Sequence, residues 1–156
     1  MKKKILGVCF IVFFFLQVFA ASAEEQIISG MPIKIGDSII QVQKSFNTNI
    51  EPSVMESKLS SGKERTELRL RTKGVWIFFD KNNMVATIRL EAPFEGSFKG
   101  IKIGDNAKLL EEKWGKPVKK VKWGRSDNYL YYPDDNYGVK FSFDEEDMID
   151  IVFVSK

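Results

Sequence analysis

The chain has 156 residues, of which 24 are Lys or Arg, 21 are Asp or Glu, one is Cys and none is His. Without histidine it cannot build a Ser-His-Asp or Cys-His nucleophile, and it lacks the commonest metal ligand of proteins. Its length suits one compact domain, which would bury roughly two-thirds of the surface of the unfolded chain.

The N-terminal residues have the three parts of a secretory signal peptide. Three lysines at positions 2–4 form a basic region, and the apolar run Ile5–Phe19 is short for a membrane span. Ala21 and Ala23 then flank a small residue, as at a cleavage site. We predict that residues 1–23 are a signal peptide cut after Ala23, and that the protein is secreted and periplasmic.

Removal of this segment would change the charge and the thiol chemistry of the chain. The basic residues would fall from 24 to the number of acidic residues, 21, which gives no electrostatic reason to expect nucleic-acid binding. Cys9 would also leave, which excludes disulfides from the mature chain. A lipid anchor at Cys9 is the alternative, but Val8 suits lipoprotein processing poorly. We therefore expect no stable membrane anchor after the signal peptide is removed.

A pentapeptide occurs twice in the chain. Ile33–Asp37 and Ile101–Asp105 both read Ile-Lys-Ile-Gly-Asp, 68 positions apart. The glycine allows a sharp change of backbone direction, and the aspartate after it is placed as a helix N-cap. We therefore expect each copy to be a turn that starts a helix.

An amphipathic helix is predicted after each turn. Apolar residues recur at helical spacing over Asp37–Phe46 and Asp105–Trp114. Asn47 opens the turn that ends the first helix, and Gly115 with Pro117 ends the second.

Alternating and apolar segments between turns predict strands in both halves. In the first half they are Ser53–Leu59, Arg65–Arg71, Gly74–Asp80 and Met84–Glu91. In the second half they are Val118–Trp123, Asn128–Tyr132, Gly138–Phe143 and Met148–Val154. The predicted fold is α+β, with two tandem repeats over residues 24–97 and 98–156, each a short helix packed on a four-stranded antiparallel sheet.

The last hairpins of the two halves match at an offset of 64 positions. Residues that are apolar in both copies are predicted to face the helix, since a slip of one residue would expose the whole set. Trp76 and Phe78 then point to the opposite face, where the second copy has Lys140 and Ser142. The matched apolar residues are Val75, Ile77 and Phe79 in the first half and Val139, Phe141 and Phe143 in the second.

Such a tandem, with its Ile-x-Ile-Gly-Asp-like turns and a helix closed by Gly-x-Pro, resembles the β-lactamase inhibitory protein fold over Met31–Val154. It is also similar to the small outer-membrane lipoprotein of the β-barrel assembly machinery, which carries one such unit. The resemblance implies a binding module whose sheets form a concave, aromatic-rich surface for a partner protein. The mature chain has neither the inhibitors' disulfides nor the lipoprotein's anchoring cysteine, so neither specific activity is carried over.

Aromatic residues outside the predicted core are the candidates for partner binding, because Trp and Tyr are enriched at binding hot spots. Their alternative role is to pack against the other half of the protein or the leader segment. The candidates are Trp76, Phe78, Trp123, Tyr129 and Tyr131.

Basic residues also surround Trp123. They could steer an acidic protein or an anionic envelope polymer to the chain, or they could protect an edge strand from aggregation. They are Lys116, Lys119, Lys120, Lys122 and Arg125.

The acidic clusters fall in predicted turns. Asp144–Asp147 lacks the spacing and the glycine of an EF-hand calcium loop, and we predict that it and Pro133–Asn136 are solvated turns. We expect no catalytic residue, metal site or cofactor, and hence a binding protein rather than an enzyme.

The sequence thus favours a secreted protein-binding module, of inhibitor or immunity type, that binds another protein through an aromatic sheet surface. Two alternatives stay open: an envelope-assembly scaffold with a broader interface, and a glycan-binding protein.

Overall fold

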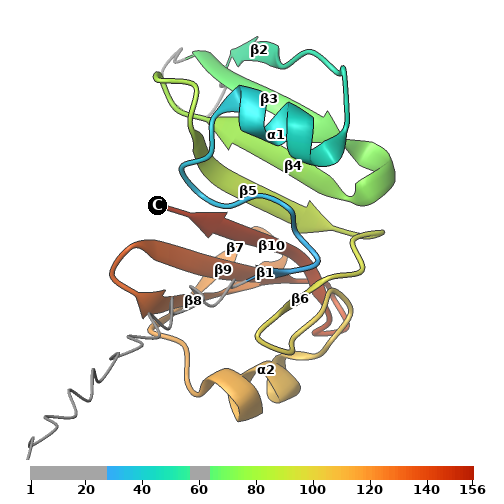
Figure 1. Ribbon diagram of the computed structural model, residues 1–156. Helices are drawn as coiled ribbons and strands as arrows, with labels where there is room; N and C mark the ends of the chain where they lie inside the picture. The colour runs from blue at the N-terminus through green and yellow to red at the C-terminus, as the bar shows by residue number, and fades with distance from the viewer. Residues whose placement is uncertain (1–27, 57–63) are drawn as a thin grey trace, which may run out of the picture.

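The computed structural model describes residues 28–56 and 64–156. Within them lie two α-helices, α1 (Ile39–Phe46) and α2 (Ala107–Trp114), a short 3-10 helix η1 (Arg71–Lys73) and ten strands (Figure 1). The strands are β1 (Ile28–Ser29), β2 (Ser53–Glu56), β3 (Glu64–Leu70), β4 (Val75–Phe79), β5 (Val85–Glu91), β6 (Ser97–Phe98), β7 (Lys119–Trp123), β8 (Ser126–Asp134), β9 (Tyr137–Phe143) and β10 (Ile149–Ser155).

The predicted elements are confirmed as an α+β arrangement of two helices and a large antiparallel sheet. The predicted signal peptide, with Ala21 and Ala23, lies outside the described residues, as does the end of the strand predicted over Ser53–Leu59. None of the described helices is both long enough and apolar enough to cross a membrane.

The repeated pentapeptide forms the same turn twice, but the predicted N-caps are wrong by one residue. Ser38 and Asn106 cap the two helices, accepting hydrogen bonds from the backbone N–H groups of Gln41 at 3.3 Å and Leu109 at 2.9 Å. The preceding aspartates, Asp37 and Asp105, close the turn instead. Their carboxylates accept the backbone N–H groups of Lys34 at 2.9 Å and Lys102 at 2.8 Å.

Each turn is fixed to the strand that ends its own half of the chain. The N–H of Gly36 donates to the Val85 carbonyl at 2.8 Å, and the N–H of Gly104 donates to the Ile149 carbonyl at 2.8 Å. Both glycines have a positive φ, 91° and 88°, which a residue with a Cβ rarely adopts. The two halves therefore share local geometry at corresponding positions.

The sheet differs from the prediction of a separate four-stranded sheet in each half. Eight strands form one sheet in the order β2-β3-β4-β5-β10-β9-β8-β7, in which every neighbouring pair is antiparallel. The halves join where β5 pairs with β10, from Thr87 opposite Ser155 to Glu91 opposite Ile151. Each of these strands ends its own half and would otherwise expose unpaired N–H and C=O groups, so the pairing removes two edges at once.

One face of this sheet carries the core, as predicted from the matched apolar residues. Val75, Ile77 and Phe79 are at most 5% exposed, and their partners in the second half, Val139, Phe141 and Phe143, are at most 2% exposed. Val42 of α1 and Leu110 of α2 are fully buried in the same cluster. Both helices therefore cover this face, α1 over the first half and α2 over the second (Figure 1).

Candidate functional site

The face of the sheet away from the helices, called the open face here, carries the candidate site. Its side chains alternate with the core residues, and the strand register aligns seven of them in one line across the sheet. We call this line the central row. From β3 to β7 it consists of Arg69, Trp76, Arg89, Phe153, Lys140, Leu130 and Lys119.

Cationic and apolar side chains alternate along the central row. Every second strand contributes a Lys or Arg, so neighbouring cations stand about 10 Å apart. An aromatic or aliphatic side chain lies between each pair of cations. The rings of Trp76 and Phe153 each contact a cation on a neighbouring strand. The row is therefore both basic and aromatic, a composition typical of binding hot spots.

Trp76 lies between two guanidinium groups. Arg69 on β3 and Arg89 on β5 flank it, and the central carbon of each guanidinium is 4.3 Å from the centre of the indole ring. Because these strands lie on opposite sides of β4, each guanidinium covers a different face of the ring.

Each of these arginines is held by a carboxylate two residues away on its own strand. Glu67 pairs with Arg69, and Glu91 pairs with Arg89. The Glu67 side chain is fully buried, and a second cation, Arg65, lies 3.6 Å from its other oxygen. A buried carboxylate needs such compensation, and the same contacts fix the guanidinium groups against the indole ring.

Lys140 is the half-buried cation of the row that lacks such a carboxylate. Its amino group lies 4.1 Å from the ring centre of Phe153 and 5.1 Å from that of Trp123. Burial lowers the pKa of Lys140 below its usual value, and the positive charge of Arg89 lowers it further. Among the described residues, no carboxylate forms an ion pair with it.

Three of the five predicted binding residues lie on the open face. Trp76 is in the central row, and Phe78 lies beside it under the guanidinium of Arg65, 4.5 Å from its ring centre. Trp123, at the end of β7, is 70% exposed. The predicted placement of Trp76 and Phe78 on the face away from the helices is thus correct, and Trp123 lies on the same face.

The prediction that Tyr129 and Tyr131 lie outside the core, on the same surface as Trp76 and Phe78, is wrong. Both project from β8 to the face covered by helix α2. The Tyr129 ring packs 4.7 Å from Phe143, and Tyr131, 5% exposed, packs 5.4 Å from Trp114. The Tyr131 hydroxyl donates a hydrogen bond of 3.1 Å to the Gly115 carbonyl, where the helix ends.

The predicted basic patch around Trp123 is divided by the alternation of β7. Lys120 and Lys122 point to the helix side, where they pair with Glu111 at 2.6 Å and Asp127 at 3.9 Å. The hydrogen bond to Glu111, and next the hydrogen bond to the Tyr129 hydroxyl, raise the pKa of Lys120. Lys119 belongs to the open face. Since β7 ends the sheet, the alternative interpretation of an edge strand protected by lysines is supported.

The predicted acidic turn over Asp144–Asp147 is confirmed as a turn. One oxygen of Asp144 accepts the N–H groups of Glu146 and Met148, each at 2.9 Å. Asp80 makes the equivalent bonds in the first half. The turn predicted over Pro133–Asn136 is shorter than expected, because β8 continues to Asp134 after an irregular register step.

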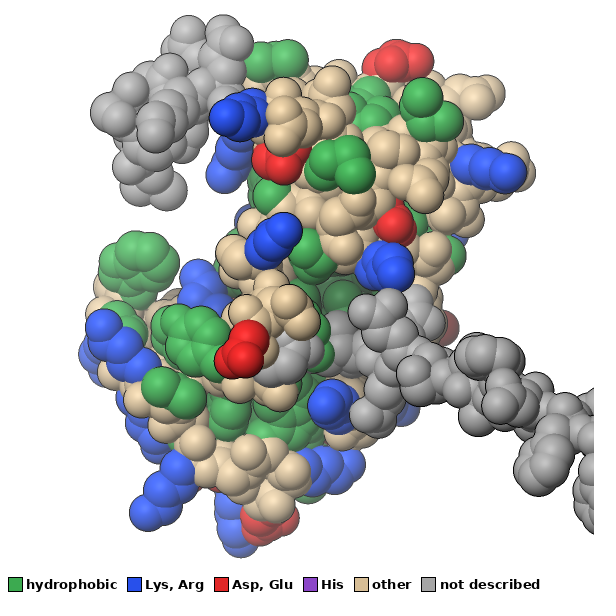
Figure 2. Space-filling view, turned by 60° about the vertical axis from the view of Figure 1, so that its left-hand side comes forward, with side chains coloured by type: hydrophobic (Ala, Val, Ile, Leu, Met, Phe, Trp, Pro, Cys, Tyr) green, Lys and Arg blue, Asp and Glu red, His purple; other side chains and the backbone are tan. Residues whose placement is uncertain are grey.

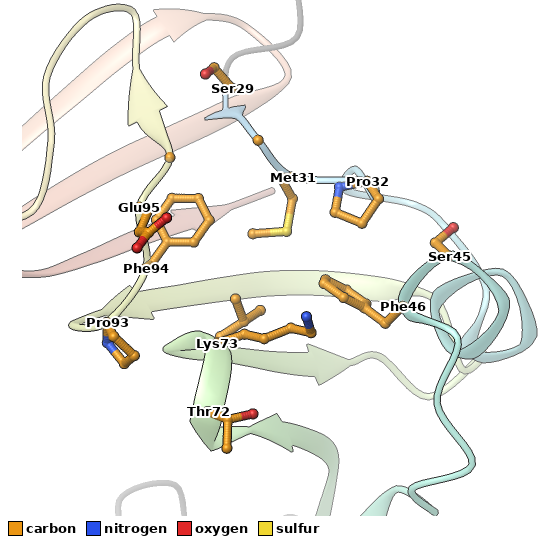
Figure 3. Close-up of a pocket in the computed structure, with 13 residues that line it drawn as sticks. Ser29, Met31, Pro32, Ser45, Phe46, Thr72, Lys73, Pro93, Phe94 and Glu95 are labelled. Atoms are coloured by element: carbon orange, nitrogen blue, oxygen red, sulfur yellow. The ribbon is translucent and has the colours of Figure 1, made fainter.

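A groove of about 870 Å³ lies elsewhere, between the end of α1, η1 and the loop before β6. Met31, Phe46 and Phe94 give it apolar walls, and Lys73 with Glu95 supplies one charge of each sign (Figure 3). Its charges are one lysine and one glutamate, whereas the open face carries a row of cations and aromatic rings, so we take the open face as the stronger candidate.

The surface of the second half also exposes apolar side chains. Figure 2 shows hydrophobic side chains gathered over the half that contains α2, with Lys and Arg side chains around them. The large hydrophobic residues exposed in this half are Val118, Trp123 and Tyr132. An apolar surface bordered by polar groups is typical of interaction sites.

Comparison with known proteins supplies no family for this chain. No family model matches it, and no curated protein matches it. Among solved structures, a DUF4309 family protein (YjgB) from Bacillus subtilis is similar, with a TM-score of 0.48 and 14% sequence identity over 76% of this chain and 77% of that one. A likeness at this level carries no functional argument.

Proposed function

We propose that this chain is a secreted, periplasmic protein-binding module, of inhibitor or immunity type, that contacts its partner through the open face. The observation that supports this proposal best is the central row. It presents Trp76 and two arginines in positions that neighbouring carboxylates already fix. A rigid aromatic and Arg surface loses little conformational entropy when a partner binds, which favours affinity.

The proposed origin of this surface is an internal duplication. Both halves use the same turn, and an isolated bridge fixes each turn to its hairpin, Ser38 to Met84 and Asn106 to Met148. Two copies placed side by side would give one sheet wide enough to support a protein interface. We propose the likeness to the β-lactamase inhibitory protein fold on the same ground, the two similar halves of the chain.

The experiment is an affinity capture from the envelope of the source cell. The bait is the full chain, produced with its own leader, and the test variant is Trp76→Ala. Ile40→Ala is the matched control, because Ile40 is 77% exposed on α1, away from the open face. We expect one partner in equal amount to the bait, captured by the parent and by the control, and lost with Trp76→Ala.

A glycan-binding role is the second candidate, favoured by Trp123. Its ring is 70% exposed, so one face could stack on another flat group. Retention of the parent chain on an immobilised envelope glycan, with loss after Trp123→Ala but not after Trp76→Ala, would favour this role over the first. Capture of many membrane proteins by the parent and both variants would instead favour an envelope-assembly scaffold.

A further inference from the structure

We infer that Lys140 is the anion-binding centre of the open face, and that the partner is an acidic protein segment that places an Asp or Glu carboxylate against it. This inference rests on the proposed function, since it names the chemistry that the open face recognises.

The amino group of Lys140 lies close to two aromatic rings. Phe153 on one neighbouring strand and Trp123 at the edge of the sheet both lie within 5.1 Å of the amino group, measured to the ring centres. Aromatic rings hold an ammonium group in place through cation–π attraction without neutralising its charge. The two rings therefore position Lys140 without supplying an opposing negative charge.

The charges of the row differ between its two ends. Positions two residues from Arg69 and Arg89 hold the glutamates that pair with them, Glu67 and Glu91. The same positions around Lys140 hold Gly138 and Ser142. The Ser142 hydroxyl is already engaged as a donor to Asn128, at 2.6 Å. Within the described part of the chain, the charge of Lys140 has no local carboxylate to oppose it.

Partial burial makes this charge a stronger site for an anion than a solvated surface lysine. A lysine loses hydration when it is half-buried, and the nearby charge of Arg89 disfavours its protonated form further. A carboxylate placed beside it would offset both penalties by its attraction, and a charge-assisted hydrogen bond is stronger in such partly desolvated surroundings.

The ring in the centre of the row favours a protein carboxylate over an acidic sugar, while the exposed ring of Trp123 is the reason that an acidic sugar is a competing probe in the test. Both faces of Trp76 are covered by guanidinium groups, so a flat sugar ring has no free face to lie against in the centre of the row. An Asp or Glu side chain is narrow and needs no free ring face to pair with the Lys140 amino group. Charge complementarity therefore points to an acidic protein segment.

The test uses poly-L-glutamate as the probe and sodium polygalacturonate as an acidic sugar of similar charge. The full chain is titrated with each polymer at low salt, and binding is followed by calorimetry. Lys140→Met removes the charge but keeps an unbranched side chain beside Phe153, whereas Lys140→Arg keeps the charge. Lys44→Met, at an exposed site on α1, is the control for loss of any one lysine charge.

We expect poly-L-glutamate to bind the parent more tightly than polygalacturonate does. Lys140→Met should weaken the binding of poly-L-glutamate about tenfold or more, the range for a hydrogen bond to a charged group. Lys140→Arg should retain most of the affinity, and Lys44→Met should match the parent. Circular dichroism of each variant checks that it is folded.

In addition, the Lys140 side-chain signal in nuclear magnetic resonance spectra should shift on addition of poly-L-glutamate, and the pKa of Lys140 should rise. Equal binding by Lys140→Met and the parent, absence of binding, or tighter binding of polygalacturonate would each overturn the inference. The proposed function would survive any of these results if Trp76→Ala still lost a captured protein. It would fail by itself if that variant captured the same partner as the parent.

Discussion

On the face that the helices cover, the two halves of the sheet carry similar side chains at matched positions. Ile77 and Ile88 of the first half correspond to Phe141 and Val152 of the second, and all four are fully buried. On the open face the matched side chains differ. Trp76 corresponds to Lys140, and the residue opposite each is Arg89 in the first half and Phe153 in the second.

Both halves nevertheless keep one aromatic–cation contact across these two strands, with the partners exchanged. The guanidinium of Arg89 lies 4.3 Å from the ring centre of Trp76, and the amino group of Lys140 lies 4.1 Å from that of Phe153. Packing restricts the covered face to apolar residues of fitting volume. The open face is free of that restriction, so the differences between the halves are best sought there when function is in question.

The largest expected effect tests whether the helix-covered parts of the two halves form one hydrophobic core. Ile77→Ala should cost about 2–5 kcal/mol and Phe141→Ala about 3–5 kcal/mol of unfolding free energy, since each leaves a cavity. Because β5 and β10 join the halves, either variant should still unfold in one urea transition. Two separate transitions, detected by circular dichroism and by tryptophan fluorescence, would show that the halves are independent.

The next effect compares two glycines that occupy the same position in the two halves. A Cβ at Gly74, where φ is 63°, would overlap the Glu91 carbonyl oxygen and come within 2.7 Å of the Phe94 nitrogen. Gly74→Ala should therefore cost more than about 2 kcal/mol. At Gly138 the nearest atom that a Cβ would meet is at the edge of the Tyr132 ring, at 3.1 Å, and the Tyr131 carbonyl oxygen is at an ordinary contact distance of 3.8 Å. Gly138→Ala should change stability by less than about 1 kcal/mol, and equal losses in urea unfolding would contradict this difference.

A smaller effect separates the two tryptophans of the open face. Trp76→Ala should cost about 2 kcal/mol, because the half-buried ring contacts two guanidinium groups. Trp123→Ala should change stability by no more than about 0.5 kcal/mol, since its ring is largely exposed. Thermal and urea unfolding of the two variants, measured side by side, would reveal the reverse order if Trp123 had a structural role instead.

The smallest effect concerns alkaline pH and the covered face of the second half. Burial, followed by the charge of Glu111, raises the pKa of Tyr131 from 10.0 to about 12. The folded state therefore holds this proton more tightly than the unfolded state, and stability should fall as pH rises from about 10 to about 12. Below pH 10 the stabilising contribution of protonated Tyr131 to the folded state is fully present.

Tyr131→Phe isolates this contribution. Loss of the hydrogen bond to Gly115 should cost about 1 kcal/mol at pH 8, and the variant should lose less stability than the parent between pH 10 and pH 12. Urea unfolding at pH 8, 10 and 11.5 makes the comparison. An unchanged pH dependence would mean that another group titrates in this range.

The side-chain placements that depend on a local residue pattern were predicted correctly. Those that depend on the order of strands in the sheet were not. Trp76 and Phe78 were assigned to the correct face because they alternate along β4 with Val75, Ile77 and Phe79. The counterparts of those three residues in the second half are also apolar. In β8, Leu130 and the tyrosines beside it are all apolar or aromatic, so periodicity cannot decide which of them faces the core. Their pairing with Phe141 and Val139 places both Tyr129 and Tyr131 beneath the helix.

The central row could not be predicted for a similar reason. Its members come from seven strands, and Arg89 meets Phe153 only because β5 pairs with β10. That junction is absent from any local pattern. The lack of a carboxylate near Lys140 on its own strand is visible in the sequence, where Gly138 and Ser142 stand two residues away, but its ring partners Phe153 and Trp123 come from other strands.

The sheet has two ends, and they differ in a way that bears on self-assembly. The end at β7 displays Lys119, Lys120 and Lys122, which repel an incoming copy of the same strand. The end at β2 instead exposes Val54 and Met55, 61% and 40% accessible. Growth of a fibre by strand addition requires both ends of every molecule to accept a neighbour. With one end blocked by charge, any association through β2 terminates at a pair of chains, which limits polymerisation where the protein is concentrated.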